Sequence, residues 1–261
     1  WYQDQSGQDN HYQPDNLTIN DIMPDSPTNN FPVLNSLDNG SNITLSQGNL
    51  KSSGSGWGDT FCTFQVPYTG KWYVELAVTT KGNNYFGLWT TNYTDTDASQ
   101  DYGTGRYIAH HGGVTGGSSG GYMSAWSDGD IIGMAIDCDN GKLHWAKNGT
   151  YGSSGNPATG ANPALTFTAT DSYKILTAGA SGNVASINFG QNGTFSGTKT
   201  AQGNTDGSGI GNFYYSVPSG FKALCSKNLP TPTIKKPSEH FNTVLYTGNG
   251  STQSITGVGF Q

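Results

Sequence analysis

One stretch of the sequence carries most of the information about the fold: Gly129-Asp130-Ile131-Ile132-Gly133-Met134-Ala135-Ile136-Asp137-Cys138-Asp139-Asn140-Gly141-Lys142-Leu143-His144-Trp145-Ala146-Lys147-Asn148-Gly149. Apolar residues alternate from Ile132 to Cys138, and the pattern continues at Leu143 and Trp145. A period of two places these side chains on one face of an extended chain. Asn140-Gly141 lies between the two runs and tolerates the positive φ angles of a type I′ turn. The stretch therefore predicts a β-hairpin that turns at Asn140-Gly141.

Two carboxylates lie beside the same turn. Asp137 and Asp139 have the alternate spacing found in calcium loops, but such a loop also needs further oxygen ligands and a closing bidentate carboxylate, which the sequence does not supply. Asp and Asn also stabilise turns by bonding to their own backbone. We therefore expect turn chemistry rather than metal binding here, and Asn148-Gly149 is a second turn signal.

The composition indicates an all-β protein. The 261 residues include 38 glycines and 12% aromatic residues, and only 11% of them are charged. Glutamate occurs only at Glu75 and Glu239. Such a composition suits short strands joined by turns and disfavours long helices, so helical bundles are excluded.

The charge balance excludes two classes of partner. The formal net charge is −6 and the only arginine is Arg106. A nucleic-acid surface needs clustered Lys and Arg to neutralise phosphates, and an anionic membrane surface needs the same residues. No apolar run approaches the ~20 residues of a membrane-spanning helix. We therefore expect neither nucleic acid nor membrane insertion.

The cysteines indicate neither a disulfide framework nor a metal site. Cys62, Cys138 and Cys225 are odd in number, far apart in sequence and set in apolar runs. We expect them to be buried small hydrophobic residues. Their spacing relative to the five histidines is not that of zinc ligands, and we expect no metal or cofactor.

The chain is predicted to have four parts. Residues 1–44 are polar and rich in Asp, Asn and Pro, which is typical of an extended arm that becomes ordered only by packing on something else. Residues 45–229 show the regular strand spacing of a β-sandwich. Residues 230–240 form a proline-rich linker, and residues 241–261 begin a further strand-rich segment. Both ends are expected to be cut from a longer chain.

Within the sandwich region the strand signals are short and regular. At Trp72, Val74, Leu76 and Val78 apolar residues alternate with other residues, which predicts a half-buried strand. Helical spacing occurs only at 221–229, where flanking prolines limit a helix to about two turns. The other predicted strands are 61–66, 85–90, 164–168, 173–180 and 184–189.

Three segments in this order resemble parts of the SPRY domain. Gly70-Lys71-Trp72-Tyr73-Val74-Glu75-Leu76 resembles its early strand, residues 129–149 its central hairpin, and Val184-Ala185-Ser186-Ile187-Asn188-Phe189-Gly190 its late strand. The resemblance implies a bent, two-sheet antiparallel β-sandwich related to the concanavalin A-like folds. It also implies a binding module whose loops at one end recognise a partner, with no catalytic set of its own.

The flanking segments resemble a narrower group. Asp25-Ser26-Pro27-Thr28-Asn29-Asn30-Phe31, residues 218–230 and residues 246–261 are similar to segments of large bacteriophage virion proteins that embed SPRY-like modules. This resemblance implies a location in the virion, other virion subunits as partners, and a homo-oligomer such as a trimer.

The region with the composition of a recognition site is 91–126. Tyr mixed with Ser, Gly and Asn supplies aromatic contact area beside adaptable hydrogen bonds, and the lone Arg106 offers a bidentate fork to a carboxylate. The alternative is that this insertion only covers the sandwich. His110-His111 is expected to be a loop pair rather than a metal or acid/base pair, and residues 203–215 have a similar style. The candidate ligand-binding residues are Tyr102, Arg106, Tyr107, His110, Tyr122 and Trp126.

The sequence does not carry the carboxylate pair of a glycosidase. Such enzymes need two carboxylates flanking the scissile bond, whereas Glu75 is the only acidic residue on its predicted strand. No Gly-x-Ser-x-Gly elbow or phosphate-binding loop occurs either. We therefore expect a non-catalytic structural or adhesion module of a phage fibre, tail or capsid-associated protein, used for assembly or receptor contact. The alternative is a soluble lectin-like module that binds carbohydrate or protein, such as a host-surface glycan.

Overall fold

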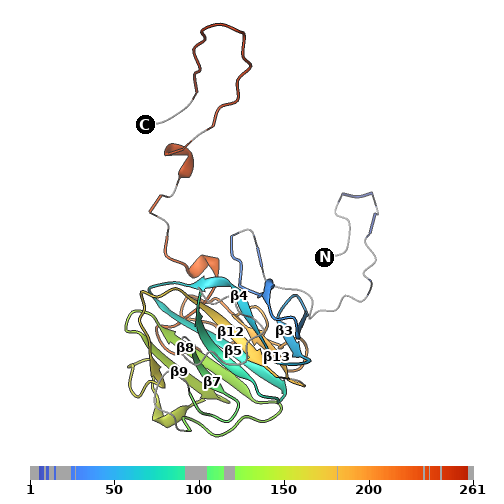
Figure 1. Ribbon diagram of the computed structural model, residues 1–261, viewed down its shortest axis with the longest axis vertical. Coiled ribbons are helices and arrows are strands. Elements are labelled where there is room, and N and C mark those ends of the chain that lie inside the picture. Colours follow the sequence, from blue (N-terminus) through green and yellow to red (C-terminus); the bar gives the residue numbers. More distant parts are fainter. Residues whose placement is uncertain are drawn as a thin grey trace. The chain divides into compact units, whose positions relative to one another are not determined.

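The fold is a two-sheet β-sandwich. A computed structural model describes residues 6–8, 10–11, 15, 25–26, 28–91, 105–114, 121–180, 182–231, 233–234, 236–241 and 243–257. The chain divides into two units, Trp1–Asn228 and Leu229–Gln261. Every strand of the described residues belongs to the first unit, where two sheets pack together (Figure 1). The predicted all-β sandwich is confirmed.

The smaller sheet has five strands in the order β1-β4-β12-β6-β7. All of its pairs are antiparallel. The predicted strands at 61–66, 85–90 and 173–180 are confirmed as its three central members. The strands are β1 (Leu34–Asn39), β4 (Gly58–Val66), β6 (Tyr85–Thr90), β7 (Arg106–Ala109) and β12 (Tyr173–Gly179).

The larger sheet has nine strands, seven of them in the order β10-β9-β8-β5-β13-β3-β2. In addition β11 pairs with β9, and β14 pairs with β5 in the one parallel pair among the described strands. The strands are β2 (Ile43–Ser46), β3 (Lys51–Gly54), β5 (Lys71–Thr80), β8 (Ile131–Asp137), β9 (Lys142–Lys147), β10 (Thr150–Tyr151), β11 (Leu165–Thr166), β13 (Val184–Asn188) and β14 (Lys222–Ala223).

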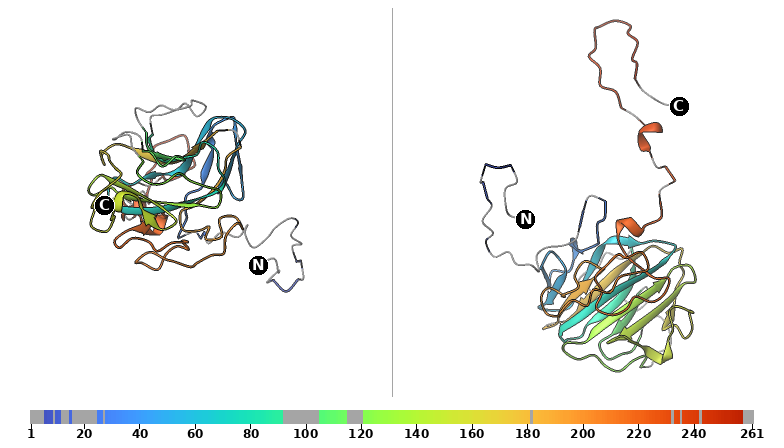
Figure 2. Two further views of the ribbon diagram at one scale, coloured as in Figure 1. Left: turned by 90° about the horizontal axis from the view of Figure 1, so that it is seen from below. Right: turned by 180° about the vertical axis from the view of Figure 1, so that it is seen from behind.

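The central strand β5 is buried on both faces, not half-buried as its alternation predicts. Trp72, Leu76 and their alternate neighbours face one way, and Tyr73 and Glu75 face the other, yet all are at most 2% exposed. The reason is a covering segment, residues 190–225, that follows β13 and crosses the second face of the sheet, where it is drawn in orange-brown in Figure 2. Polar residues on that face are therefore part of the interior.

The predicted hairpin is confirmed, but its turn differs from the expected type. β8 pairs with β9 from Ile132↔Lys147 to Asp137↔Lys142, which leaves a four-residue connection. Gly141 has a positive φ of 60°, whereas Asn140 does not have one. The Asp137 carboxylate accepts hydrogen bonds from the Asn140 backbone N–H (3.1 Å) and side-chain amide (2.9 Å), and it pairs with Lys71 at 3.0 Å. This confirms turn chemistry for Asp137.

The type I′ geometry occurs instead at the second Asn-Gly pair. Asn148 and Gly149 have φ angles of 51° and 79°, and they join β9 to β10 with Lys147 paired to Thr150. The Asn148 side chain holds the turn in place, because its Oδ1 accepts from the Ile131 N–H at 2.9 Å and its Nδ2 donates to Asp130 at 2.7 Å. The turn therefore aims β10 back along the edge of the large sheet.

Three further expectations need correction or restatement. The helix predicted at 221–229 is wrong: this segment contains β14 and the 3-10 turn η3 (Ser226–Asn228), because Ala223 pairs in parallel with Tyr73 of β5. The sandwich begins at β1, so residues 34–44 belong to it and not to the arm predicted for 1–44. In residues 230–261 the described positions contain one 3-10 turn, η4 (Pro237–Glu239), and no strand, in place of the strand-rich segment expected at 241–261.

The three cysteines are buried and free, as their sequence context predicts. Burial raises the pKa of the Cys62 thiol to about 11 and that of Cys138 to about 12, so both remain protonated at neutral pH. Among the described residues, no helix has the length and apolar character needed to cross a membrane.

Candidate functional site

The residues predicted from the 91–126 region lie at different depths. Tyr102 lies outside the described residues. Arg106 and His110 are half-buried, and the other three side chains are buried: Tyr107 is 1%, Tyr122 7% and Trp126 1% exposed. A ligand-binding role for this group stays a prediction.

The contacts of Tyr107 are those of a packed aromatic residue on the small sheet. Its ring stacks on Trp89 with centroids 5.2 Å apart and an interplanar angle of 6°, and it meets the edge of Tyr85 at 5.1 Å. The Trp126 backbone N–H donates to the His110 carbonyl at 2.8 Å, which brings these two predicted residues together. Tyr107 and Trp126 therefore help to build the sandwich.

The two histidines lie in a turn after β7, as predicted. The His110 and His111 rings are 5.2 Å apart at 75°. Burial lowers the pKa of His110, and the neighbouring His111 and Lys81 lower it further. His111 Nδ1 accepts a hydrogen bond from the Gly113 N–H at 3.1 Å. Within the described ranges, no group of three His, Cys, Asp or Glu side chains could hold a metal ion.

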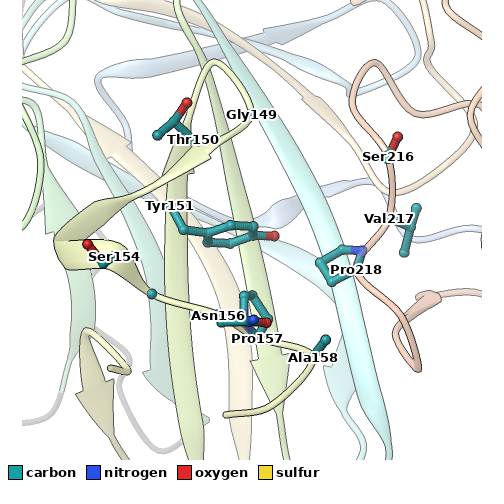
Figure 3. A pocket seen from close by; sticks show the side chains of 11 residues that line it. Gly149, Thr150, Tyr151, Ser154, Asn156, Pro157, Ala158, Ser216, Val217 and Pro218 are labelled. Carbon is teal, nitrogen blue, oxygen red and sulfur yellow. The ribbon is translucent and has the colours of Figure 1, made fainter. Parts of the chain in front are cut away.

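A groove of about 600 Å³ lies elsewhere, at the edge of the large sheet. One wall and the floor come from residues 149–158, and the other wall comes from Ser216, Val217 and Pro218 of the covering segment (Figure 3). The Tyr151 ring lies across the floor and its hydroxyl end points toward Pro218 (Figure 3). The remaining lining residues are Gly149, Thr150, Ser154, Gly155, Asn156, Pro157 and Ala158.

The first wall is a strained loop fixed to the sheet. Ser153 and Ser154 both have positive φ angles, 48° and 57°, within the 3-10 turn η2 (Gly152–Ser154). Consecutive non-glycine residues in this conformation are uncommon, and such strain tends to gather at functional sites. Asn156 and Ala161 form a two-way backbone bridge at 2.9 and 3.1 Å that closes the loop. The wall thus has one defined shape.

Residues of β9 and Tyr122 hold the same loop from below. Lys142 Nζ donates to the Gly160 carbonyl at 2.9 Å, and His144 Nε2 donates to the Ala161 carbonyl at 3.0 Å, because a carbonyl can only accept. Tyr122 lies so close to Gly152 that an added Cβ there would come within 2.4 Å of its backbone oxygen. Tyr122, one of the predicted site residues, therefore packs against the loop that forms the first wall.

The second wall is held by a buried carboxylate. Glu75, on β5, is fully buried and accepts hydrogen bonds from the backbone N–H groups of Tyr214 and Tyr215, each at 2.8 Å. Asn188 on β13 donates to Glu75 at 3.3 Å and to the Asn212 carbonyl at 2.9 Å. These bonds end one residue before Ser216. Glu75 therefore positions the backbone that leads into the second wall.

Two opposing effects set the protonation of Glu75. Burial favours the neutral acid, and the N–H donors of Tyr214 and Tyr215 favour the carboxylate. Burial has the larger effect, so the pKa of Glu75 is raised above its usual 4.5. Tyr73 donates its hydroxyl to the same carboxylate at 3.2 Å. All of these partners are structural, so the arrangement fixes a segment of chain and leaves no open carboxylate facing the groove.

The lining of the groove is uncharged. None of its residues is Asp, Glu, Lys, Arg or His. The only titratable side chain is Tyr151, whose pKa is raised by burial and by the nearby Tyr122 and Glu75, so it is a neutral phenol. The groove can therefore offer hydroxyl and amide groups, an aromatic ring and the half-buried Pro218 ring to a ligand.

The comparisons with known proteins add little beyond the fold. No family model matches the sequence, and no curated protein matches it. Among solved structures, the chain is similar to the SPRY domain of human HERC1, with 12% identity and a TM-score of 0.47. That match covers 59% of this chain and 96% of the other. A likeness this weak says nothing about what the chain binds, and the fold assignment rests on the sheet topology.

The first wall of the groove has the same composition as the 91–126 region. Residues 150–162 mix Tyr with Ser, Gly, Asn and Thr, which is the same composition that drew attention to 91–126. They directly follow the Asn148-Gly149 turn, which already marked a chain reversal. The second wall carried a weaker signal, since residues 203–215 were noted for a similar style and Ser216 is the next residue.

Proposed function

We propose that the chain is a non-catalytic structural and adhesion module of a bacteriophage virion protein of the fibre, tail or capsid-associated kind. In this proposal the sandwich is a rigid carrier, the segment from Leu229 assembles with other copies, and the groove contacts a receptor. The proposal rests on the resemblance of the flanks and on one structural observation, the exposed apolar side chains of the second unit.

Those side chains favour assembly. Phe241 is 69% exposed, Leu245 100% and Tyr246 66%. Exposed apolar residues gathered on one short segment mark interaction sites, because covering them releases water from apolar surface. Most soluble oligomers are formed by copies of one chain arranged with closed symmetry. A homo-oligomer that covers this segment therefore fits a structural protein.

The mass of the full chain in solution tests assembly. Light scattering after gel filtration should give a multiple of 27.6 kDa for the wild type. Replacement of the three most exposed apolar residues of the segment, Phe241→Ser, Leu245→Ser and Tyr246→Ser, should give a monomer with an unchanged melting temperature. A matched triple substitution of exposed polar neighbours, Thr243→Ala, Thr247→Ala and Asn249→Ala, should leave the oligomer intact. A wild-type monomer at every concentration would overturn assembly through this segment.

The location needs a separate test. Mass spectrometry of purified phage particles should find peptides of this chain in a constant ratio to the other particle proteins. Finding the chain only in the soluble fraction, with none in particles, would overturn the virion part of the proposal.

The groove favours a second candidate, a soluble lectin-like module that binds carbohydrate or protein. This candidate needs the sandwich and the groove but no assembly. A monomer that binds its ligand as well as the full oligomer does would support it over the first.

A further inference from the structure

We infer that the groove between residues 149–158 and 216–218 is a binding site for an uncharged saccharide. The inference rests on the proposed function and deepens it, because it names the class of receptor and the surface that would contact it. The site is distinct from the 91–126 region to which the sequence directed attention.

The charge of the lining selects the ligand class. With no ionised side chain among the lining residues, the groove offers no counter-charge to a carboxylate, sulfate, phosphate or amine. A charged group that leaves water without a partner costs several kcal/mol by the usual order of magnitude. Sialylated or sulfated glycans and phosphorylated groups are therefore disfavoured relative to neutral sugars.

Residues with hydrogen-bonding side chains line the groove on both walls. Thr150, Ser154 and Asn156 lie on the first wall and Ser216 lies on the second, and all four are exposed. A hydroxyl or an amide side chain can both donate and accept. Sugar hydroxyls need exactly such two-way partners, and they need them on more than one side of the ring.

The floor and the walls also supply apolar surface. The half-buried Tyr151 ring lies across the floor, and the half-buried Pro218 lies beyond its hydroxyl end (Figure 3). A pyranose ring has a C–H-rich face that packs on an aromatic ring, whose face carries partial negative charge. The volume of about 600 Å³ lies within the usual range of small-ligand sites.

Both walls are fixed before any ligand arrives. The first is closed by the bridge between Asn156 and Ala161, and the second is bonded to Glu75 through Tyr214 and Tyr215. Pre-organised walls reduce the ordering cost of binding. An added peptide strand is less suited to this place, because the edge strand β10 has only two residues to pair with it.

A glycan array probed with the full chain, followed by calorimetry with the best neutral oligosaccharide, tests the inference. The blocking variant is Ser216→Trp, which fills the groove from an exposed position on its wall. Its matched control is Ser219→Trp, which is equally exposed but does not line the groove. We expect neutral glycans to bind, Ser216→Trp to weaken binding by more than about tenfold, and Ser219→Trp to change it by less than about twofold.

Three results would overturn the inference: no neutral glycan binds, only charged glycans or proteins bind, or Ser216→Trp binds as the wild type does while its melting temperature is unchanged. Assembly is measured separately by light scattering. If the protein is an oligomer but binds no neutral glycan, the saccharide site is refuted and the proposed structural function is not. If it is a monomer and binds no neutral glycan, both the saccharide site and assembly through the segment from Leu229 are refuted.

Discussion

The two faces of β5 are buried to the same extent by different means. One face carries Trp72, Val74, Leu76 and Val78 and is covered by apolar packing. The other carries Tyr73 and Glu75 and is covered by a segment that is fixed by hydrogen bonds to the carboxylate. A period-two pattern therefore shows which side chains of a strand are apolar. It does not show that the polar face of the strand is exposed to solvent.

Truncation on the apolar face should have the largest effect. Leu76 is fully buried, and Leu76→Ala should lower the free energy of unfolding by about 2–5 kcal/mol, because it removes buried methyl groups and leaves a cavity. Leu37, which is 95% exposed, provides the matched control, and Leu37→Ala should stay within about 0.5 kcal/mol of the wild type in urea denaturation. Equal losses at both positions would contradict the packing described for β5.

Neutralisation on the polar face should cost less and act locally. In Glu75→Gln one oxygen becomes an NH₂ donor, so one of the Tyr214 and Tyr215 N–H groups loses its acceptor, at a cost of about 1–3 kcal/mol. Hydrogen exchange should speed up at these two amides first and spread to the second wall of the groove. The matched control is Glu239→Gln at the exposed second glutamate, which should be nearly neutral. Unchanged exchange at Tyr214 and Tyr215 would show that Glu75 does not hold the covering segment.

A smaller change should sharpen the same point. A Cβ at Gly133 would lie 2.6 Å from the Tyr73 hydroxyl, so Gly133→Ala should move that hydroxyl away from Glu75. We expect a loss of about 1–2 kcal/mol from the crowding. Gly207→Ala is the control, because an added Cβ there meets nothing within 4 Å. A crystal structure of Gly133→Ala with Tyr73 unmoved would refute this account.

The pH dependence should be the weakest signal, and its sign differs between two carboxylates. The pKa of Glu75 is raised above 4.5, so the folded state holds this proton more tightly and its contribution to stability falls as pH rises from 4.5 through the folded pKa. For Asp137 burial is outweighed by bonds from Asn140 and Lys71, and the pKa is lowered below 3.8. Its contribution is present above 3.8 and is lost as pH falls through the folded pKa.

Unfolding measured between pH 3 and pH 8 by roughly unit steps can separate the two. Glu75→Gln should flatten the decline above 4.5, and Asp137→Asn should flatten the acid loss below 3.8. If the free energy of unfolding of Glu75→Gln still declines above pH 4.5 as it does in the wild type, the raised pKa of Glu75 is not the cause of that decline.

The sequence predicted the strands that carry their own apolar pattern. Alternation and turn signals predict β5, β6, β8 and β9, because the apolar residues of these strands are the ones that become buried. β3, with the sequence Lys51-Ser52-Ser53-Gly54, has no such pattern and is held by pairing with β13 on one side and β2 on the other. Tertiary context outweighs local preference in such strands.

The predictions of a type I′ turn at Asn140-Gly141 and of a helix at 221–229 were wrong because another contact competes with the local preference. Asn140-Gly141 and Asn148-Gly149 are identical pairs, but the Asp137 side chain captures the Asn140 backbone and holds it in a different turn. At 221–229 the helical spacing of apolar residues is real, yet the parallel pairing of Ala223 with Tyr73 of β5 removes the first turn. The Asp137–Asn140 contact spans only three residues, but the sequence does not show whether it or the Asn-Gly preference sets the turn, whereas the Ala223–Tyr73 pairing joins residues 150 positions apart.

The residues that line the groove are not among the candidate residues that the sequence indicated, and a binding role for those candidates stays a prediction. The Tyr, Ser, Gly and Asn composition applies to the groove as well as to 91–126, and only the fold brings Ser216 opposite Tyr151. Among the described candidate residues, Tyr122 packs against the loop that forms the first wall, at Gly152 and Gly155.

The parallel strand β14 has a mechanical consequence. Asp206 accepts hydrogen bonds from the Ala223 N–H at 3.0 Å and from the Asn228 side chain at 2.8 Å, and Ala223 in turn pairs with β5. Tension applied to the chain at Leu229 would reach the sandwich through these bonds. The load would first reach the two-residue strand β14, whose pairing partner among the described strands is β5, and the Asp206 carboxylate that ties this strand to Asn228. Because β14 begins four residues after Pro218, tension on the chain would act close to the second wall of the groove.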